Sequence, residues 1–122
     1  MTGPRKSATG LQRIVDATRY SLAGLREAAG RERAFQQELL ATLVLVPFAL
    51  WLGDDGLERA VMIGSLILVL IVELVNSAVE ATQDRISLEQ HPLAKNAKDY
   101  GSAAVMLALV NAALVWLLVL LG

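Results

Sequence analysis

The stretch Glu73-Leu-Val-Asn76-Ser77-Ala-Val-Glu80 places two carboxylates and an amide inside a run that is otherwise apolar enough to lie in a membrane. In a helix, positions i, i+3, i+4 and i+7 fall on one face, so these four polar side chains form a single stripe. An ionisable side chain at membrane depth is costly and is usually retained for function. The stripe therefore predicts a functional site inside a membrane helix.

The composition of the chain is that of a small integral membrane protein. The chain has 122 residues, 55% of them hydrophobic, and a mean hydropathy of +0.51. This is too short for two domains and too apolar for an ordinary soluble domain, so a single domain over residues 1–122 is expected. The absence of cysteine excludes disulfides and thiol chemistry.

The basic residues are unevenly distributed along the chain. Ten of the eleven Lys and Arg residues lie in the first 33 residues or between Arg85 and Lys98, and the acidic connector Gly53–Arg59 holds the remaining one. Cytoplasmic segments of membrane proteins carry an excess of Lys and Arg. We therefore expect the N-terminus and the connector 81–99 to be cytoplasmic and the acidic connector to face outward.

This alternation predicts an all-α membrane protein with three transmembrane helices and the C-terminus outside. The spans are expected near residues 36–53, 60–80 and 98–121. Only fifteen uncharged residues separate Glu38 from Asp54 in the first of them, fewer than the ~20 that cross the hydrocarbon core. Its helix is therefore expected to begin earlier, within Arg33–Glu38.

An N-terminal amphipathic surface helix is predicted at about residues 10–30. Apolar or β-branched residues recur at helical spacing at Leu11, Ile14, Val15, Thr18, Leu22 and Leu25, while Arg13, Arg19 and Arg26 keep the segment cationic. Such a helix lies on an anionic leaflet. Gly30 is expected to mark the turn into the first span. A simple membrane anchor is the alternative interpretation.

The residues available for chemistry are mostly oxygen ligands. The chain has no Walker loop, no soluble-kinase signature and a single histidine. What remains near the expected cytoplasmic interface is a set of carboxylates with an amide and two lysines, namely Glu32, Glu38, Glu73, Glu80, Asp84, Asn76, Lys95 and Lys98. Hard oxygen ligands of this kind suit Mg²⁺, which binds one or two carboxylates together with substrate phosphates.

The two carboxylates of the stripe are expected to have different roles. Glu73 precedes Glu80 by about two helical turns, or roughly 10 Å. The deeper Glu73 suits a general base, and Glu80, nearer water, suits a metal ion. The alternative for Glu73 and Asn76 is interhelical hydrogen bonding that fixes an oligomer.

The third span contributes further candidates. Lys98 can meet phosphate as a point charge, or it can simply extend to the interface. The small residues 101–104 allow a backbone or ligand to approach closely. Asn111 predicts a helix-packing contact, Trp116 an interfacial anchor, and His91-Pro92 a turn before this span.

Taken together, these motifs closely resemble the bacterial diacylglycerol kinase family. The matching blocks are Glu73–Glu80, Asp84-Arg85-Ile86 and Ala97-Lys98-Asp99-Tyr100-Gly101-Ser102-Ala103-Ala104, with Arg13-Ile14, Tyr20-Ser21, Gly24-Leu25-Arg26 and Glu32–Glu38 upstream. The resemblance covers nearly the whole chain from about residue 10. It implies a small enzyme of the bacterial inner membrane that uses ATP and Mg²⁺ to phosphorylate a lipid hydroxyl in phospholipid metabolism, and it implies no nucleic-acid partner.

The same resemblance implies roles for individual residues. Glu73 would be the general base, and Glu32 and Glu80 would hold the metal, assisted by Asn76. Nucleotide contacts are implied at Arg13, Tyr20, Glu32, Asn76, Glu80, Glu89, Gln90, His91, Lys98 and Asp99. Lipid contacts are implied at Arg13, Arg26, Glu38, Glu73, Ser102 and Trp116. The family pattern also implies a homotrimer whose sites are shared between subunits.

Three other interpretations stay open on the sequence. A related kinase acting on undecaprenol is the nearest, because the same fold in other bacteria serves that long polyprenyl alcohol. A subunit of a small multidrug transporter would need a carboxylate nearer mid-membrane and a fourth span. A non-catalytic oligomerising scaffold would use the polar stripe only for packing, and it leaves Lys98, Asp99 and Glu32 unexplained.

Overall fold

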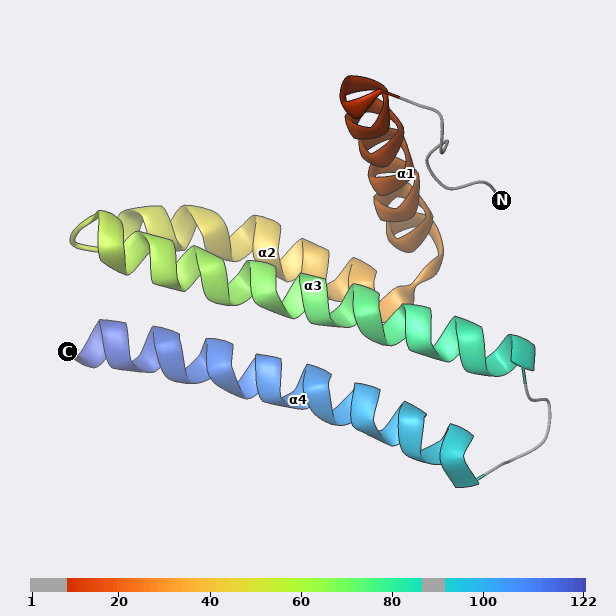
Figure 1. Ribbon diagram of the computed structural model, residues 1–122. Helices are drawn as coiled ribbons and strands as arrows, with labels where there is room; N and C mark the ends of the chain where they lie inside the picture. The colour runs from red at the N-terminus through yellow and green to blue at the C-terminus, as the bar shows by residue number, and fades with distance from the viewer. Residues whose placement is uncertain (1–8, 87–91) are drawn as a thin grey trace.

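The computed structural model of the chain describes residues 9–86 and 92–122, and no strand occurs within these ranges. The helices are α1 (Gly10–Arg31), α2 (Arg33–Leu52), α3 (Gly56–Ile86) and α4 (Pro92–Leu121). Helix α3 packs against both α2 and α4, whereas α1 leaves the end of this unit at a steep angle and contacts α2 (Figure 1). The predicted all-α class is confirmed.

Three of the helices are long and apolar enough to cross a membrane, as predicted. Helix α2 has 20 residues, α3 has 31 and α4 has 30, against the ~20 that a span requires. Residues 81–86 and 92–97, which were expected in the connector, belong to α3 and α4. The polar residues at these ends are therefore held on rigid helices.

The first helix ends at a sharp bend that lies two residues beyond the expected position. Helix α1 continues through Gly30 to Arg31, so the prediction of a turn at Gly30 is wrong. The bend lies at Glu32, whose extended backbone (φ −94°, ψ 107°) interrupts the helical path while its N–H still donates to Ala28 O at 2.9 Å. Helix α2 begins at Arg33, within the segment where its start was expected.

A short loop with reciprocal hydrogen bonds joins α2 to α3. The Asp54 N–H donates to Glu58 Oε1 at 2.8 Å, and the Glu58 N–H donates to Asp55 Oδ1 at 2.9 Å. Arg59 Nε adds a bond to Gly53 O at 3.2 Å. This pairing resembles a capping box, which satisfies the free amides at a helix start. It fixes α2 and α3 as an antiparallel pair.

The apolar core of a single chain is small. Met62 on α3 is fully buried, and Trp116 of α4 donates its Nε1–H to the Met62 carbonyl at 3.2 Å. Trp116, expected as an interfacial anchor, is therefore partly buried against α3. Asn111 is exposed, so the packing contact predicted for it is not made within one chain. Large apolar side chains along α2, α3 and α4 are also exposed, as suits surfaces that face lipid or other subunits.

Candidate active site

The polar stripe of α3 runs from a buried end to an exposed end. Glu73 is only 5% exposed, Asn76 and Ser77 are partly buried, and Glu80 is exposed. This gradient agrees with the difference in depth expected for the two carboxylates. A buried ionisable group needs a partner that offsets its lost hydration. The groups packed around the Glu73 carboxyl therefore determine its chemical role.

The partner of Glu73 comes from α2. The Glu38 side chain lies within hydrogen-bonding reach of the Glu73 side chain, and Glu38 Oε2 is buried with no hydrogen-bond partner among the described residues. Two adjacent carboxylates repel each other, and a hydrogen bond between them requires a proton. The two carboxyl groups therefore face each other across the α2–α3 interface. The roles of the two residues themselves stay predictions.

The sequence contained a signal for this pairing that was missed. Glu38 lies 17 positions before Asp55, and Glu73 lies 17 positions after Gly56. Positions equally far from the tight turn of a helical hairpin lie at the same height in its two arms. The turn prediction together with this symmetry could have placed Glu38 beside Glu73, whereas the resemblance assigned Glu38 to lipid contact only.

Glu32 lies at the edge of a cavity between α1 and α3. The cavity has a volume of about 660 Å³. Its α1 side includes Glu27, Ala28 and, at the bend, Glu32, and its α3 side includes Ser77 and Ala81. Glu32 therefore faces the same space as Ser77 of the polar stripe. The structure thus places a predicted metal ligand at the same cavity as Ser77, although more than 40 residues separate the two in sequence.

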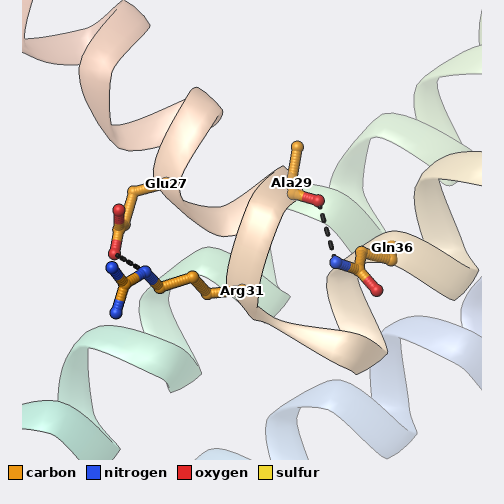
Figure 2. A network of polar contacts seen from close by, with 4 residues as sticks. All are labelled: Glu27, Ala29, Arg31 and Gln36. Carbon is orange, nitrogen blue, oxygen red and sulfur yellow. Dashed lines mark hydrogen bonds and ion pairs between the residues drawn. The ribbon is translucent and has the colours of Figure 1, made fainter.

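Two polar contacts lie near the end of α1, and one of them joins α1 to α2 (Figure 2). Gln36 of α2 donates its Nε2–H to the Ala29 carbonyl of α1 at 2.9 Å. On the other side of the last turn of α1, Arg31 Nε pairs with Glu27 Oε2 at 3.0 Å. The Gln36 bond joins the two helices directly across the bend at Glu32.

The predicted nucleotide contacts on α1 lie along its length. Arg13 is exposed and Tyr20 is partly buried. Each is seven or fourteen residues before Glu27, so the three share one helix face, and Glu27 lines the cavity. Arg26, a predicted lipid contact, is exposed on the same helix.

The charged residues at the start of α4 are already paired. Lys98 Nζ donates to Asp84 Oδ1 of α3 at 2.6 Å, and Lys95 Nζ donates to Asp99 Oδ2 at 2.7 Å. The Lys98–Asp84 pair joins α3 to α4. Both pairs are substantially exposed, so water weakens them and a phosphate can compete for Lys98. The predicted contacts Glu89, Gln90 and His91 lie outside the described residues.

Two predicted lipid contacts lie far apart on α4. Ser102 is exposed and precedes Trp116 by about four turns, or roughly 21 Å. Trp116 lines a separate apolar cavity of about 260 Å³ with Leu45 of α2 and Leu66 of α3. Within one chain the structure therefore does not bring Trp116 to the cavity that Glu32 lines.

The donors present fit a magnesium ion that is shared with a substrate. Within residues 9–86 and 92–122, no group of three or more His, Cys, Asp or Glu residues could hold a metal by itself. Mg²⁺ commonly takes one or two carboxylates and completes its shell with water and phosphate oxygens. Glu32 at the cavity and the exposed Glu80 on α3 each offer a carboxylate of the right chemistry for that mode.

The family model for prokaryotic diacylglycerol kinase matches residues 19–120 of the chain. The chain belongs to this family. The match extends from α1 to the end of α4 and so includes the stripe, the bend and the Lys98 region. The predicted family is thereby confirmed.

Relatives within the diacylglycerol kinase family are similar over nearly their full lengths. The diacylglycerol kinase of Pseudomonas aeruginosa is 55% identical over 119 residues, which cover 98% of this chain and 97% of the relative. That of Escherichia coli K12 is 47% identical, with 93% of each chain covered. That of Haemophilus influenzae is 44% identical, with 88% of this chain and 92% of the relative covered. Membership in a family of lipid kinases favours an enzyme over the transporter and scaffold interpretations.

Proposed function

We propose that this protein transfers the γ-phosphoryl group of ATP to the hydroxyl of diacylglycerol, giving phosphatidic acid. The observation that carries the proposal is the contact between Glu38 of α2 and the buried Glu73 of α3, because α3 also carries Ser77, which lines the cavity beside Glu32. A lipid hydroxyl sits at headgroup depth, where a carboxylate inside a membrane helix can reach it. The phosphates of ATP stay in the aqueous layer, nearer Glu80 and Lys98.

The carboxyl pair supplies the base. In this proposal Glu38 carries a proton, and Glu73 is the carboxylate beside the lipid hydroxyl. The hydroxyl oxygen forms a bond to the γ-phosphorus, the bond from the γ-phosphorus to the β–γ bridging oxygen breaks, and ADP leaves with that electron pair. The hydroxyl proton passes to Glu73. A base placed in this way contributes about 10²–10⁴-fold to a rate.

The residues around the cavity position the nucleotide. Glu32 and Glu80 would hold Mg²⁺ together with the ATP phosphates, and Asn76 would assist. When bound, the metal neutralises the charge that develops on the transferring phosphoryl group. Lys98 exchanges its bond to Asp84 for a phosphate oxygen. The implied nucleotide contacts of Arg13, Tyr20 and Asp99, and those of Glu89, Gln90 and His91 in the connector, complete this part of the proposal.

The lipid is proposed to lie along the outside of the helices, near Arg26, Glu38 and Ser102. Trp116 would contact it only in an assembly, because within one chain this residue lies at the far end of α4. The exposed mid-helix amide of Asn111 supports assembly, since an amide facing hydrocarbon lacks a partner. We therefore propose a homotrimer with sites shared between subunits, in the bacterial inner membrane, with the N-terminus inside and the C-terminus outside, as the charge distribution indicates.

The test is phosphate transfer from labelled ATP by the purified protein in bicelles, with diacylglycerol and undecaprenol offered in parallel, each with and without Mg²⁺. Mg²⁺-dependent labelling of diacylglycerol is the expected result, and Glu73→Gln protein serves as the inactive control. Preferential labelling of undecaprenol would move the assignment to the related kinase. No labelling of either alcohol by folded protein would refute the proposal.

Sharing of sites between subunits has a separate test. Glu32→Gln and Glu73→Gln proteins, each inactive alone, are unfolded together and reassembled as mixed oligomers. If one subunit supplies Glu32 and its neighbour supplies Glu73, some sites in the mixture contain both native residues and activity returns. Mixtures that stay inactive although the subunits have exchanged would show that each site belongs to one chain.

A further inference from the structure

Gly101 of α4 lies directly against the side chain of Asn76 on α3. A Cβ atom added to Gly101 would overlap Asn76 Oδ1, and it would lie 3.1 Å from Asn76 Cγ and 3.7 Å from Asn76 Cβ. The first of these approaches is closer than real side chains make. An alanine at position 101 therefore requires the Asn76 amide to move or the two helices to separate.

The requirement for glycine at position 101 comes from the lack of room for a Cβ atom, and not from the backbone conformation. Gly101 lies inside α4, and no glycine among the described residues has a positive φ. Glycine inside a helix lowers helix stability relative to alanine. At Gly64 on α3 and at Gly30 on α1, an added Cβ would meet nothing within 4 Å. Gly101 thus differs from these helical glycines in having a side chain pressed against it.

The Asn76 amide is held in a position that costs hydrogen bonding. Asn76 Oδ1 is buried and has no hydrogen-bond partner within the described part of the chain. An unsatisfied buried acceptor is destabilising, so folding energy alone does not explain this orientation. Asn76 lies three residues after Glu73 and four residues before Glu80, which places its amide between the proposed base and the proposed metal ligand.

We propose that Gly101 is a positioning residue for phosphoryl transfer. By lacking a side chain, it forms the slot that fixes the Asn76 amide between Glu73 and Glu80. The inference rests on the function proposed above. It gives α4 a part in positioning the Asn76 amide through the absence of a side chain at Gly101. Its effect passes entirely through Asn76, which makes the inference testable by pairing substitutions at the two positions.

The kinetic test is a double-mutant cycle in bicelles, with Gly64→Ala as the matched control. Gly101→Ala is expected to lower kcat/KM for MgATP by about tenfold or more, because displacements of about 1 Å in a site cost up to about 10²-fold. Gly64→Ala should stay within about twofold of the native protein. In an Asn76→Ala background, Gly101→Ala should change kcat/KM by less than about twofold, since the side chain it displaces is gone. Where Asn76→Ala is too slow to assay, the same cycle is run on the dissociation constant of MgATP.

A spectroscopic test reads the position of Asn76 without activity. The chain contains three asparagines, at positions 76, 96 and 111, so ¹⁵N-asparagine labelling gives three pairs of side-chain amide signals, and Asn76→Ala identifies one pair. Gly101→Ala should shift the Asn76 signal and leave those of Asn96 and Asn111 in place, whereas Gly64→Ala should shift none.

The possible outcomes separate the two proposals. Equal losses from Gly101→Ala in both backgrounds would mean that Gly101 acts by helix packing alone, and the inference would be wrong. An unmoved Asn76 signal or native kinetics in Gly101→Ala would also overturn it. If the native protein and Gly64→Ala phosphorylate diacylglycerol while the cycle fails, only the inference falls. If neither phosphorylates any lipid, the proposed function falls with it.

Discussion

The two ends of the α2–α3–α4 unit differ in how far their polar groups are hydrogen-bonded. At the turn end, residues 53–66 and Trp116, the polar groups of the loop are bonded to one another, and the buried Ser65 hydroxyl donates to Met62 O at 2.7 Å. At the site end, residues 73–85 with Glu38 and 95–102, buried Glu38 Oε2 and Asn76 Oδ1 lack partners within the described chain. The polar groups described above at the turn end have hydrogen-bond partners within the fold, whereas two buried acceptors at the site end do not.

This difference indicates which end is shaped by folding and which by chemistry. Buried acceptors without partners are rare because each lowers stability. At the site end they occur beside a pair of carboxyl groups and a cavity, where a proton or a metal ion can complete them. Proteins commonly depart from good local packing at functional sites. Substitutions at the two ends should therefore affect different measured quantities.

The largest effect on activity is expected at Glu73. Glu73→Gln keeps the shape and one hydrogen bond of the side chain but cannot accept the lipid proton, so turnover should fall by about 10²–10⁴-fold. Resistance to SDS unfolding and the oligomeric state should stay close to native. Retained turnover with lost assembly would instead mean that Glu73 belongs with the packing residues.

The matching substitution at the turn end is Met62→Ala, which should affect stability. Removing a fully buried side chain leaves a cavity and typically costs about 2–5 kcal/mol. The free energy of unfolding in SDS should therefore fall, while KM for MgATP stays within about twofold of native. A large change in KM together with the stability loss would break the separation between the two ends.

A smaller effect is expected at the exposed end of the stripe. Glu80→Gln should raise the Mg²⁺ concentration needed for half-maximal activity by at least about tenfold, the scale seen when even the outer partners of metal ligands are removed. Turnover at saturating Mg²⁺ should recover in part. An unchanged Mg²⁺ titration would remove Glu80 from the metal site and leave it as a solvated carboxylate.

The smallest expected effect concerns the bend. Gln36→Met keeps the size of the side chain and removes the donor to Ala29 O, a bond whose net value is about 0.5–1.5 kcal/mol. Because that bond joins α1 to α2 across the bend at Glu32, KM for MgATP should rise by about two- to tenfold, and kcat should change little. Steady-state kinetics at saturating lipid measure both, and an unchanged KM would show that the bend is rigid without Gln36.

The sequence predicts those parts of the molecule that depend on pattern. Apolar runs and charge asymmetry gave three long helices, and periodicity gave the surface helix and the stripe from Glu73 to Glu80. The start of α2 at Arg33 followed from the length that a span requires. These features depend on residue types at fixed spacing, which the sequence contains in full.

The parts that were missed depend on how helices meet. The bend at Glu32 instead of Gly30, the Lys98–Asp84 pair and the contact of Gly101 with Asn76 are set by interhelical distances and side-chain rotamers. Periodicity within one helix carries no such information. The Glu38–Glu73 pair is intermediate, because its position could be counted from the loop although its contact could not.

The equal spacing of Glu38 and Glu73 from the α2–α3 loop restricts how this hairpin can evolve. One residue inserted into either arm would turn the carboxylate beyond it by about 100° around its helix and move it by about 1.5 Å along the axis. The pair would then no longer face each other. A change in length between the loop and the pair therefore preserves the contact only if both helices change together by about a whole turn, roughly 3.6 residues. Membranes of different thickness are otherwise accommodated by changes beyond the carboxylates.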